Sequence, residues 1–236
     1  MLVVRLTREV LITVSLTRAV TLAVERSYSG EGEDMILKLL FDTAGADRRG
    51  FYVDVGAHDP HRFSNTHLFY RRGWRGINID ATPGSMRLFN KYRPGDVNIE
   101  SGVGTAATTM QFYVFNEPAV NSFDAQLSRE RHDAGPHRIE KVIDVPVAPL
   151  KDLIHGRIPS GVPSFLTVDV EGVDLDVLQS NDWGAFRPDY VLAECYGATI
   201  EGAARSPIST FLASVGYEFV AKTVNTSFYR LTDERR

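Results

Sequence analysis

The chain has 236 residues, of which 43% are hydrophobic and 24% charged, and its formal net charge is −4. This length and apolar content predict one domain whose core is large enough to need neither disulfides nor structural metals. The mildly acidic balance, without a long basic run, argues against a nucleic-acid partner. The single cysteine, Cys195, excludes an intrachain disulfide and fits a reducing compartment.

The N-terminal residues predict an arm that precedes the domain. Residues 1–24 are rich in Leu, Val, Ile and Ala, but Arg5, Arg8, Glu9 and Arg18 interrupt them. No charge-free stretch is long enough for a transmembrane segment, and no signal-peptide pattern is evident. We therefore expect an amphipathic packing arm over 1–27, or alternatively a membrane-surface helix, followed by one cytoplasmic domain over 28–236.

Short β-branched runs alternate with helical patterns along the rest of the chain, which predicts an α/β fold with a mostly parallel sheet. The strands expected, in chain order, are 50–56, 76–80, 97–103, 110–115, 142–147, 163–170 and 188–194, with a closing hairpin at 217–224 and 226–231. The helices expected are 65–72, 85–91, 173–180 and 209–215. Residues 116–135 are polar and rich in chain breakers, so they are expected to form a long loop or lid.

The first expected strand ends in Val53-Asp54-Val55-Gly56-Ala57-His58. Gly56 permits a sharp turn and a close approach of a ligand to the backbone. Open α/β sheets bind ligands at the carboxyl ends of their strands, where this turn is expected. By itself the motif fits an ordinary strand-to-helix turn equally well.

Asp80 ends the next expected strand, 26 positions after Asp54. An acidic side chain there can accept hydrogen bonds from both hydroxyls of a ribose. The G-x-G-x-x-G pattern of dinucleotide sites is absent, since the turn reads Gly56-Ala57-His58-Asp59-Pro60-His61. These residues favour a cofactor with a ribose and no pyrophosphate, of which S-adenosylmethionine is the common one. The alternative for Asp80 is a helix cap or a solvated strand end.

Two carboxylates, Asp169 and Glu171, follow the strand expected at 163–170. Such a pair could bind a divalent metal or raise the pKa of one member, and either effect would help to take a proton from a hydroxyl. Alternatively, one of them caps the next helix, and this structural role is favoured for Glu171. Glu194 ends the following strand and needs a partner if it is buried.

Together these segments resemble the FkbM family of methyltransferases, from about Tyr28 to Leu231. The resemblance is carried by Gly32-Glu33-Asp34, Val53–His58, Asp80, Asp169-Val170-Glu171-Gly172 and Glu194. Gly30, Asp174 and the segment Leu150-Lys151-Asp152-Leu153 depart slightly from the family pattern. The resemblance implies a Rossmann-like, seven-stranded class I methyltransferase fold over 28–236, with helices on both faces of a mostly parallel sheet.

The resemblance also implies S-adenosylmethionine as cofactor and O-methylation of a hydroxyl. The cofactor-binding residues would be Glu33, Asp54, Gly56, Ala57, Asp80, Gly102 and Gly104. Asp169, His58 and Asp59 would be catalytic, and Asp169 with Glu171 would hold a divalent metal if one takes part. The acceptor would be a small molecule or a glycan, such as a sugar on a glycolipid or lipo-oligosaccharide, including the fucose of a nodulation factor. Phe115 and Phe123 would stack on sugar rings or pack beneath the lid.

Two other functions stay open. The first is an NAD-dependent sugar oxidoreductase, which the missing glycine pattern disfavours. The second is a non-catalytic cofactor-binding module, which the several carboxylates at strand ends disfavour. The sequence does not specify the oligomeric state.

Overall fold

The computed structural model describes residues 25–44, 49–195 and 199–232. Of the expected N-terminal arm, residues 1–24 lie outside the described part of the chain. In the described ranges, no helix combines the length and the apolar character that crossing a membrane requires.

A seven-stranded sheet forms the centre of the molecule, in the order β3-β2-β1-β7-β8-β10-β9. Its strands are β1 (Phe51–Val55), β2 (Arg75–Asp80), β3 (Val97–Glu100), β7 (Ser164–Val168), β8 (Tyr190–Glu194), β9 (Tyr217–Lys222) and β10 (Thr226–Leu231). The first five run parallel, and β10 is antiparallel to both of its neighbours. This sheet confirms the fold class expected from the sequence.

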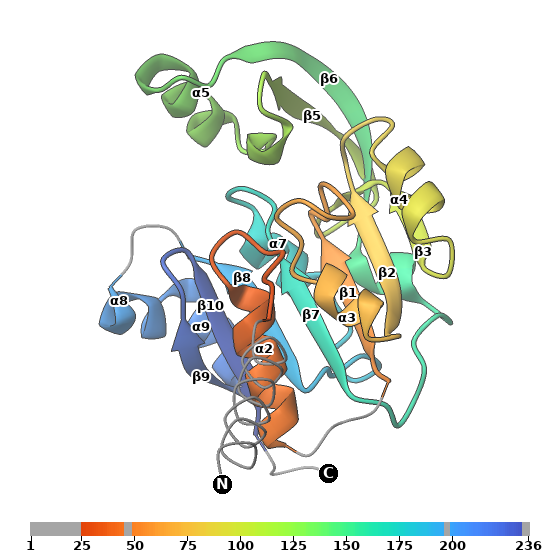
Figure 1. Cartoon of the computed structure of the whole chain (residues 1–236). Coiled ribbons are helices and arrows are strands. Elements are labelled where there is room, and N and C mark those ends of the chain that lie inside the picture. The colour runs from red at the N-terminus through yellow and green to blue at the C-terminus, as the bar shows by residue number, and fades with distance from the viewer. Residues whose placement is uncertain (1–24, 45–48, 196–198, 233–236) are drawn as a thin grey trace, which may run out of the picture.

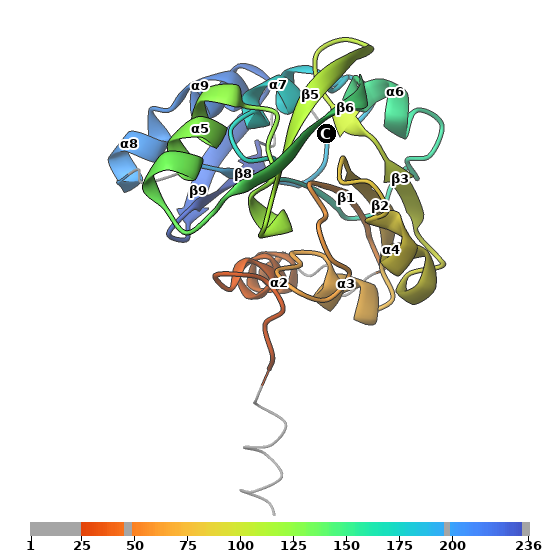
Figure 2. The same cartoon turned by 90° about the horizontal axis from the view of Figure 1, so that it is seen from above.

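Helices cover both faces of the sheet, which is why its central strands are almost continuously apolar. On one face lie α2 (Glu33–Thr43) and α3 (His67–Arg71), and on the other lie α6 (Leu150–Ile154), α7 (Asp174–Gln179) and α9 (Pro207–Ser214), as Figure 2 shows. Phe41 and Phe165 belong to the core under α2 and α3, whereas Leu166 and Leu212 belong to the core on the other face. Two further helices are α4 (Met86–Tyr92), beside β3, and α8 (Ile200–Ala204).

A second sheet has three strands. They are β5 (Thr108–Phe115) and β6 (Ile139–Ala148), which form an antiparallel hairpin, and β4 (Gly102–Val103), which pairs with β6. Residues 108–148 form a projection that we call the arm, distinct from the N-terminal arm expected over 1–27. Between β5 and β6 lie the 3-10 helix η1 (Pro118–Val120) and the helix α5 (Ala125–Ala134). Figure 1 shows the hairpin rising beyond the main sheet, with α5 at its far end.

The expectation of a long loop over 116–135 is wrong for α5. Asp124 caps this helix, because its side chain accepts hydrogen bonds from the backbone N–H groups of Gln126 (2.8 Å) and Leu127 (2.9 Å). Helix α5 is polar on most sides, so it lacks the apolar stripe by which an amphipathic helix is recognised. The single strand expected at 97–103 is also wrong, since Ser101 separates β3 from β4 and the two belong to different sheets.

Helices α2, α6 and α8 have no counterpart among the elements expected from the sequence. For α2 the signal was present, because Leu37 and Phe41 stand four residues apart and both are buried. Helices α6 and α8 have only five residues each, too few for a periodic pattern.

Candidate active site

A pocket lies where the carboxyl ends of β1, β2 and β7 meet. Strand β1 pairs with β2 on one side and with β7 on the other, so the pocket occupies the topological switch point of the sheet. Its volume is about 490 Å³ with the solvent at its mouth included. The lining residues are Val55, Gly56, His58, Ile79, Asp80, Ala81, Thr82, Ser101, Gly102, Val103, Phe112, Pro118, Ala119, Asn121, Phe123, Asp169, Val170 and Glu171.

The pocket brings together only part of the site predicted from the sequence. The predicted residues that line it are Gly56, His58, Asp80, Gly102, Asp169 and Glu171. The predicted residues that do not line it are Glu33, Asp54, Ala57, Asp59 and Gly104.

The turn after β1 is shaped by the neighbouring strand. Gly56 has φ 84°, and a Cβ atom there would overlap the carbonyl oxygen of Asp169. His58, two residues on, has φ 53°, a conformation that non-glycine residues rarely adopt. Unusual backbone geometry of this kind gathers at functional sites, where surrounding contacts hold it in place.

Asp80 connects the two loops that flank the pocket. Its Oδ2 accepts a hydrogen bond from the backbone N–H of His58 (2.9 Å), and its Oδ1 accepts one from Thr82 (2.7 Å). A carboxylate has about four lone-pair sites, so acceptor capacity remains for a ligand. The position of Asp80 in the pocket therefore accommodates the ribose role, which stays a prediction.

Asp54 belongs to a buried polar network behind the pocket. Its Oδ2 accepts a hydrogen bond from the Thr66 hydroxyl (2.7 Å), which in turn accepts one from Arg93 (2.7 Å). Burial raises the pKa of Asp54 to about 6. Arg93, only 1% exposed, also donates to Ser64 (2.8 Å), so the network holds the loop over residues 58–66. Sequence reasoning missed Arg93, because nothing local marks an arginine as buried.

Glu33 and Asp59 make local contacts outside the pocket. Glu33, at the start of α2, accepts hydrogen bonds from the backbone N–H of Glu31 (2.8 Å) and the hydroxyl of Thr226 (3.2 Å). Asp59 accepts two backbone N–H bonds within its own turn, from His61 (2.8 Å) and Arg62 (2.9 Å). Partial burial acts to raise the pKa of Asp59, but these hydrogen bonds outweigh it and lower the pKa.

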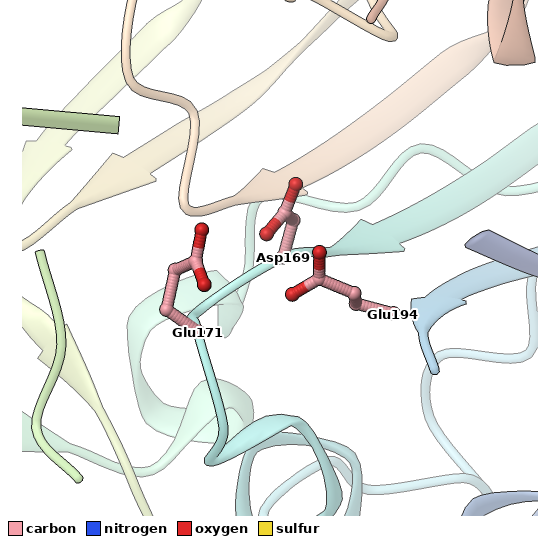
Figure 3. Close-up of side chains that lie close together, drawn as sticks. All are labelled: Asp169, Glu171 and Glu194. Atoms are coloured by element: carbon pink, nitrogen blue, oxygen red, sulfur yellow. The ribbon is translucent and has the colours of Figure 1, made fainter. Parts of the chain in front are cut away.

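Three carboxylates meet at the other side of the pocket. Asp169 and Glu171, after β7, and Glu194, at the end of β8, point toward one another in Figure 3, and one oxygen from each lies within 4.8 Å of the others. A side-chain hydrogen bond joins Asp169 to Glu194, which requires a proton between the two carboxyl groups. The protein packed around Asp169, with the nearby charges of Glu171 and Asp174, raises its pKa well above the ordinary value. Its side chain nevertheless remains exposed to the pocket.

Glu171 faces a positive partner instead. Its carboxylate forms an ion pair with the guanidinium of Arg131, from α5, and its carbonyl oxygen accepts a hydrogen bond from Ser122 (2.6 Å). Its backbone is left-handed, with φ 58°. Sequence reasoning missed Arg131, because α5 was not expected to be a helix.

An apolar wall completes the pocket on the side of the arm. The ring centroids of Phe112 and Phe123 lie 4.7 Å apart. Gly102 packs against the Phe123 ring, because a Cβ atom there would lie only 2.6 Å from it. Phe123 lines the pocket, whereas Phe115, the last residue of β5, is 1% exposed and does not line it, so of the two rings only Phe123 is placed to contact a sugar. Asn121, also missed, donates to the Thr82 hydroxyl (3.1 Å) across the mouth of the pocket.

An open α/β sheet with a pocket at its switch point and an acidic residue at the end of β2 defines a Rossmann-like fold. The model of the methyltransferase FkbM domain matches residues 54–219. The chain therefore belongs to the FkbM methyltransferase family, as the resemblance predicted.

Among solved structures, the chain is similar to the crystal structure of methyltransferase FkbM from Methylobacillus flagellatus KT. The two are 15% identical, with a TM-score of 0.47, over 77% of this chain and 43% of that one. The chain thus spans less than half the length of that structure. No curated protein matches the chain.

Proposed function

We propose that the protein is an S-adenosylmethionine-dependent O-methyltransferase that methylates a hydroxyl group of a sugar. The observation that carries this proposal is one pocket with Asp80 on one side and the solvent-exposed Asp169 on the other. Asp80 ends β2 and Asp169 follows β7, and these two strands flank β1, so their backbones stand two strand spacings apart, roughly 10 Å. Such a pocket suits an elongated cofactor with a ribose near one end and a reacting group near the other.

The residues present fit this cofactor. Asp80 has acceptor capacity left for ribose hydroxyls, and the apolar lining of Val103 and Phe112 suits an adenine ring. Asp169 lies where a positively charged end would be attracted. The glycine-rich turn of a pyrophosphate site is absent, so a phosphate-free cofactor fits better than a dinucleotide.

The chain's own contribution to the reaction would be alignment and proton transfer. When bound, the cofactor would supply a methyl carbon whose bond to sulfur breaks as the acceptor oxygen bonds to it. The pocket must hold that oxygen about 3–3.5 Å from the carbon. Asp169 would accept the hydroxyl proton, since its raised pKa makes its carboxylate a stronger base than that of an ordinary aspartate. His58 lines the pocket as a second candidate base, whereas Asp59 does not.

The carboxylate contacts favour methyl transfer without a metal. Three carboxylates within 4.8 Å are a donor set that a hard divalent cation accepts. However, Glu171 is already paired with Arg131, and Asp169 is hydrogen-bonded to Glu194. A cation would have to displace Arg131 from Glu171 and the proton that Asp169 and Glu194 share.

The acceptor class follows from the walls of the pocket and from the family resemblance. Asn121 and Thr82 present polar groups for hydroxyls, and Phe123 presents an aromatic ring for the apolar side of a sugar. The finer choice among a glycan, a glycolipid and the fucose of a nodulation factor rests on the resemblance alone. A cytoplasmic location completes the proposal.

Calorimetry with S-adenosylmethionine, S-adenosylhomocysteine and NAD tests the cofactor, and mass spectrometry of a glycan panel tests the acceptor. We expect the first two compounds to bind, NAD not to bind, and one acceptor to gain the mass of one methyl group. A protein that is folded by circular dichroism but binds neither sulfur compound would contradict the proposal. Cofactor binding without transfer to any acceptor would indicate a non-catalytic module instead.

A further inference from the structure

Helix α5 packs against the turn that follows β7. Gly172 in this turn has φ 110°, and a Cβ atom there would lie 3.0 Å from Leu127 and 3.4 Å from Asp124, both at the start of α5. The hydroxyl of Ser122, just before α5, donates to the carbonyl of Glu171 (2.6 Å). The arm and the catalytic strand end are therefore in direct contact.

Arg131 adds the charged part of this contact. Its guanidinium pairs with the Glu171 carboxylate and also donates to the carbonyl of Val120 (3.2 Å), within the arm. The side chains of Arg131 and Glu171 are only 16% and 10% exposed. A charge-assisted hydrogen bond with so little access to water is stronger than a surface ion pair.

We propose that Arg131 is a positioning residue, which neutralises the Glu171 carboxylate, holds the arm over the pocket and leaves Asp169 as the carboxylate that meets the substrates. The two acidic residues differ in the way this role requires, because Glu171 is buried, whereas Asp169 is exposed and lines the pocket. This inference rests on the proposed function, because it assigns the charge that the cofactor encounters.

The net charge of the Arg131–Glu171 pair affects how strongly the pocket binds a positively charged ligand. S-adenosylmethionine carries a positive sulfonium that S-adenosylhomocysteine lacks, while the two share their adenosine and amino-acid groups. The ratio of their affinities therefore reports the electrostatic potential in the pocket. A change in the shape of the pocket that weakens both ligands equally leaves this ratio unchanged. Removing the Arg131 charge makes the pocket more negative and favours the cation, whereas removing the Glu171 charge makes the pocket more positive and disfavours it.

The experiment is calorimetry of both compounds at pH 8 with the wild type and five variants. Arg131→Met should raise the ratio of S-adenosylmethionine to S-adenosylhomocysteine affinity about threefold or more, and Glu171→Gln should lower it by a similar factor. The double variant should return to the wild-type ratio although every contact of the pair is lost, and Arg131→Lys should stay near it.

Arg129→Met is the matched control. Arg129 is an exposed residue of the same helix, so this variant removes the same charge without touching the pair. A ratio that changes equally in Arg131→Met and Arg129→Met, or a double variant that fails to restore it, would overturn the inference.

Hydrogen exchange provides a second readout that needs no cofactor. Amides of residues 125–134 should exchange faster in Arg131→Met than in Arg129→Met or the wild type, because the arm loses its charged anchor. Equal exchange in all three would overturn the anchoring role. A wild type that binds neither compound would contradict the proposed function instead, and the exchange result would still decide whether Arg131 holds the arm.

Discussion

Gly56 lies so close to the carbonyl oxygen of Asp169 that no Cβ atom fits between them. The backbone N–H of Asp169 also donates to the carbonyl of Val55 (3.0 Å). The ends of β1 and β7 are therefore packed backbone against backbone. The glycine in this turn is required by a neighbouring strand, whether or not a cofactor also approaches it.

This contact predicts that Gly56→Ala is far more costly than a substitution at a comparable turn. Gly84 has almost the same φ, 85° against 84°, but a Cβ atom there would meet only the side chain of Arg87, at 3.7 Å. Both variants pay for the left-handed backbone, and only Gly56→Ala must also displace Asp169. We expect Gly56→Ala to lose at least about 2 kcal/mol more in urea unfolding than Gly84→Ala. Equal losses would show that the strand ends separate easily.

Asp80→Asn should weaken the binding of S-adenosylhomocysteine about tenfold or more, because hydrogen bonds to a charged group contribute roughly 1.5–3 kcal/mol. The matched control is Glu100→Gln. Glu100 pairs with Asp80 in register and accepts the backbone N–H of Gly84 (2.7 Å), but it does not line the pocket. Calorimetry measures the affinity of both variants for S-adenosylhomocysteine. Similar affinities in Asp80→Asn and Glu100→Gln would contradict the ribose role of Asp80.

Asp169→Asn should lower the rate of methyl transfer by about 10²–10⁴, the usual contribution of a general base. Affinity for S-adenosylhomocysteine should change little, since no proton moves on binding. The control is Asp176→Asn on α7, where the side chain is exposed. Initial rates with the best acceptor of the glycan panel measure the effect, and a rate within threefold of the wild type would exclude Asp169 as the base.

The rate of the wild type should also depend on pH in a defined direction. The pKa of Asp169 is raised well above its ordinary value, and only the ionised carboxylate can accept a proton. The rate should therefore fall as the pH drops through this raised pKa, at a higher pH than an ordinary aspartate would require. A rate that stays constant from pH 8 down to pH 4 would contradict this assignment.

Asp174→Asn should stabilise the protein at pH 8. Asp174 is 4% exposed, and burial raises its pKa from 3.8 to about 7. The folded state thus favours the protonated form, and the stability it contributes is full below pH 3.8 and lost as the pH rises through 7. Asparagine avoids this ionisation, so we expect a gain of a few kcal/mol, on the order of the pKa shift.

Thermal unfolding at pH 8 and pH 5 measures this gain, with Asp176→Asn as the exposed control. The difference between Asp174→Asn and the wild type should be larger at pH 8, where the buried carboxylate of the wild type is ionised. A larger difference at pH 5 would mean that the carboxylate is stabilised in the folded state.

The sequence alone placed the strands of the main sheet along the chain and identified the residues at their tips. Gly56, Asp80 and Asp169 could be placed in one pocket, because the carboxyl ends of parallel strands meet at one edge of a sheet. Their roles depend on short local patterns, in which a buried apolar run leads directly into a glycine or an acid. Such patterns are independent of what the rest of the chain does.

Only the tertiary structure decided which charges face one another. In the folded chain Asp54 bonds to Thr66, which also bonds to Arg93, behind the pocket. Glu171 forms an ion pair with Arg131, which lies on a helix that the sequence did not reveal. The side chains of Glu171 and Arg131 are forty positions apart in the chain. Such pairings depend on how separate elements pack, and a polar residue carries no local mark of the partner that compensates its burial.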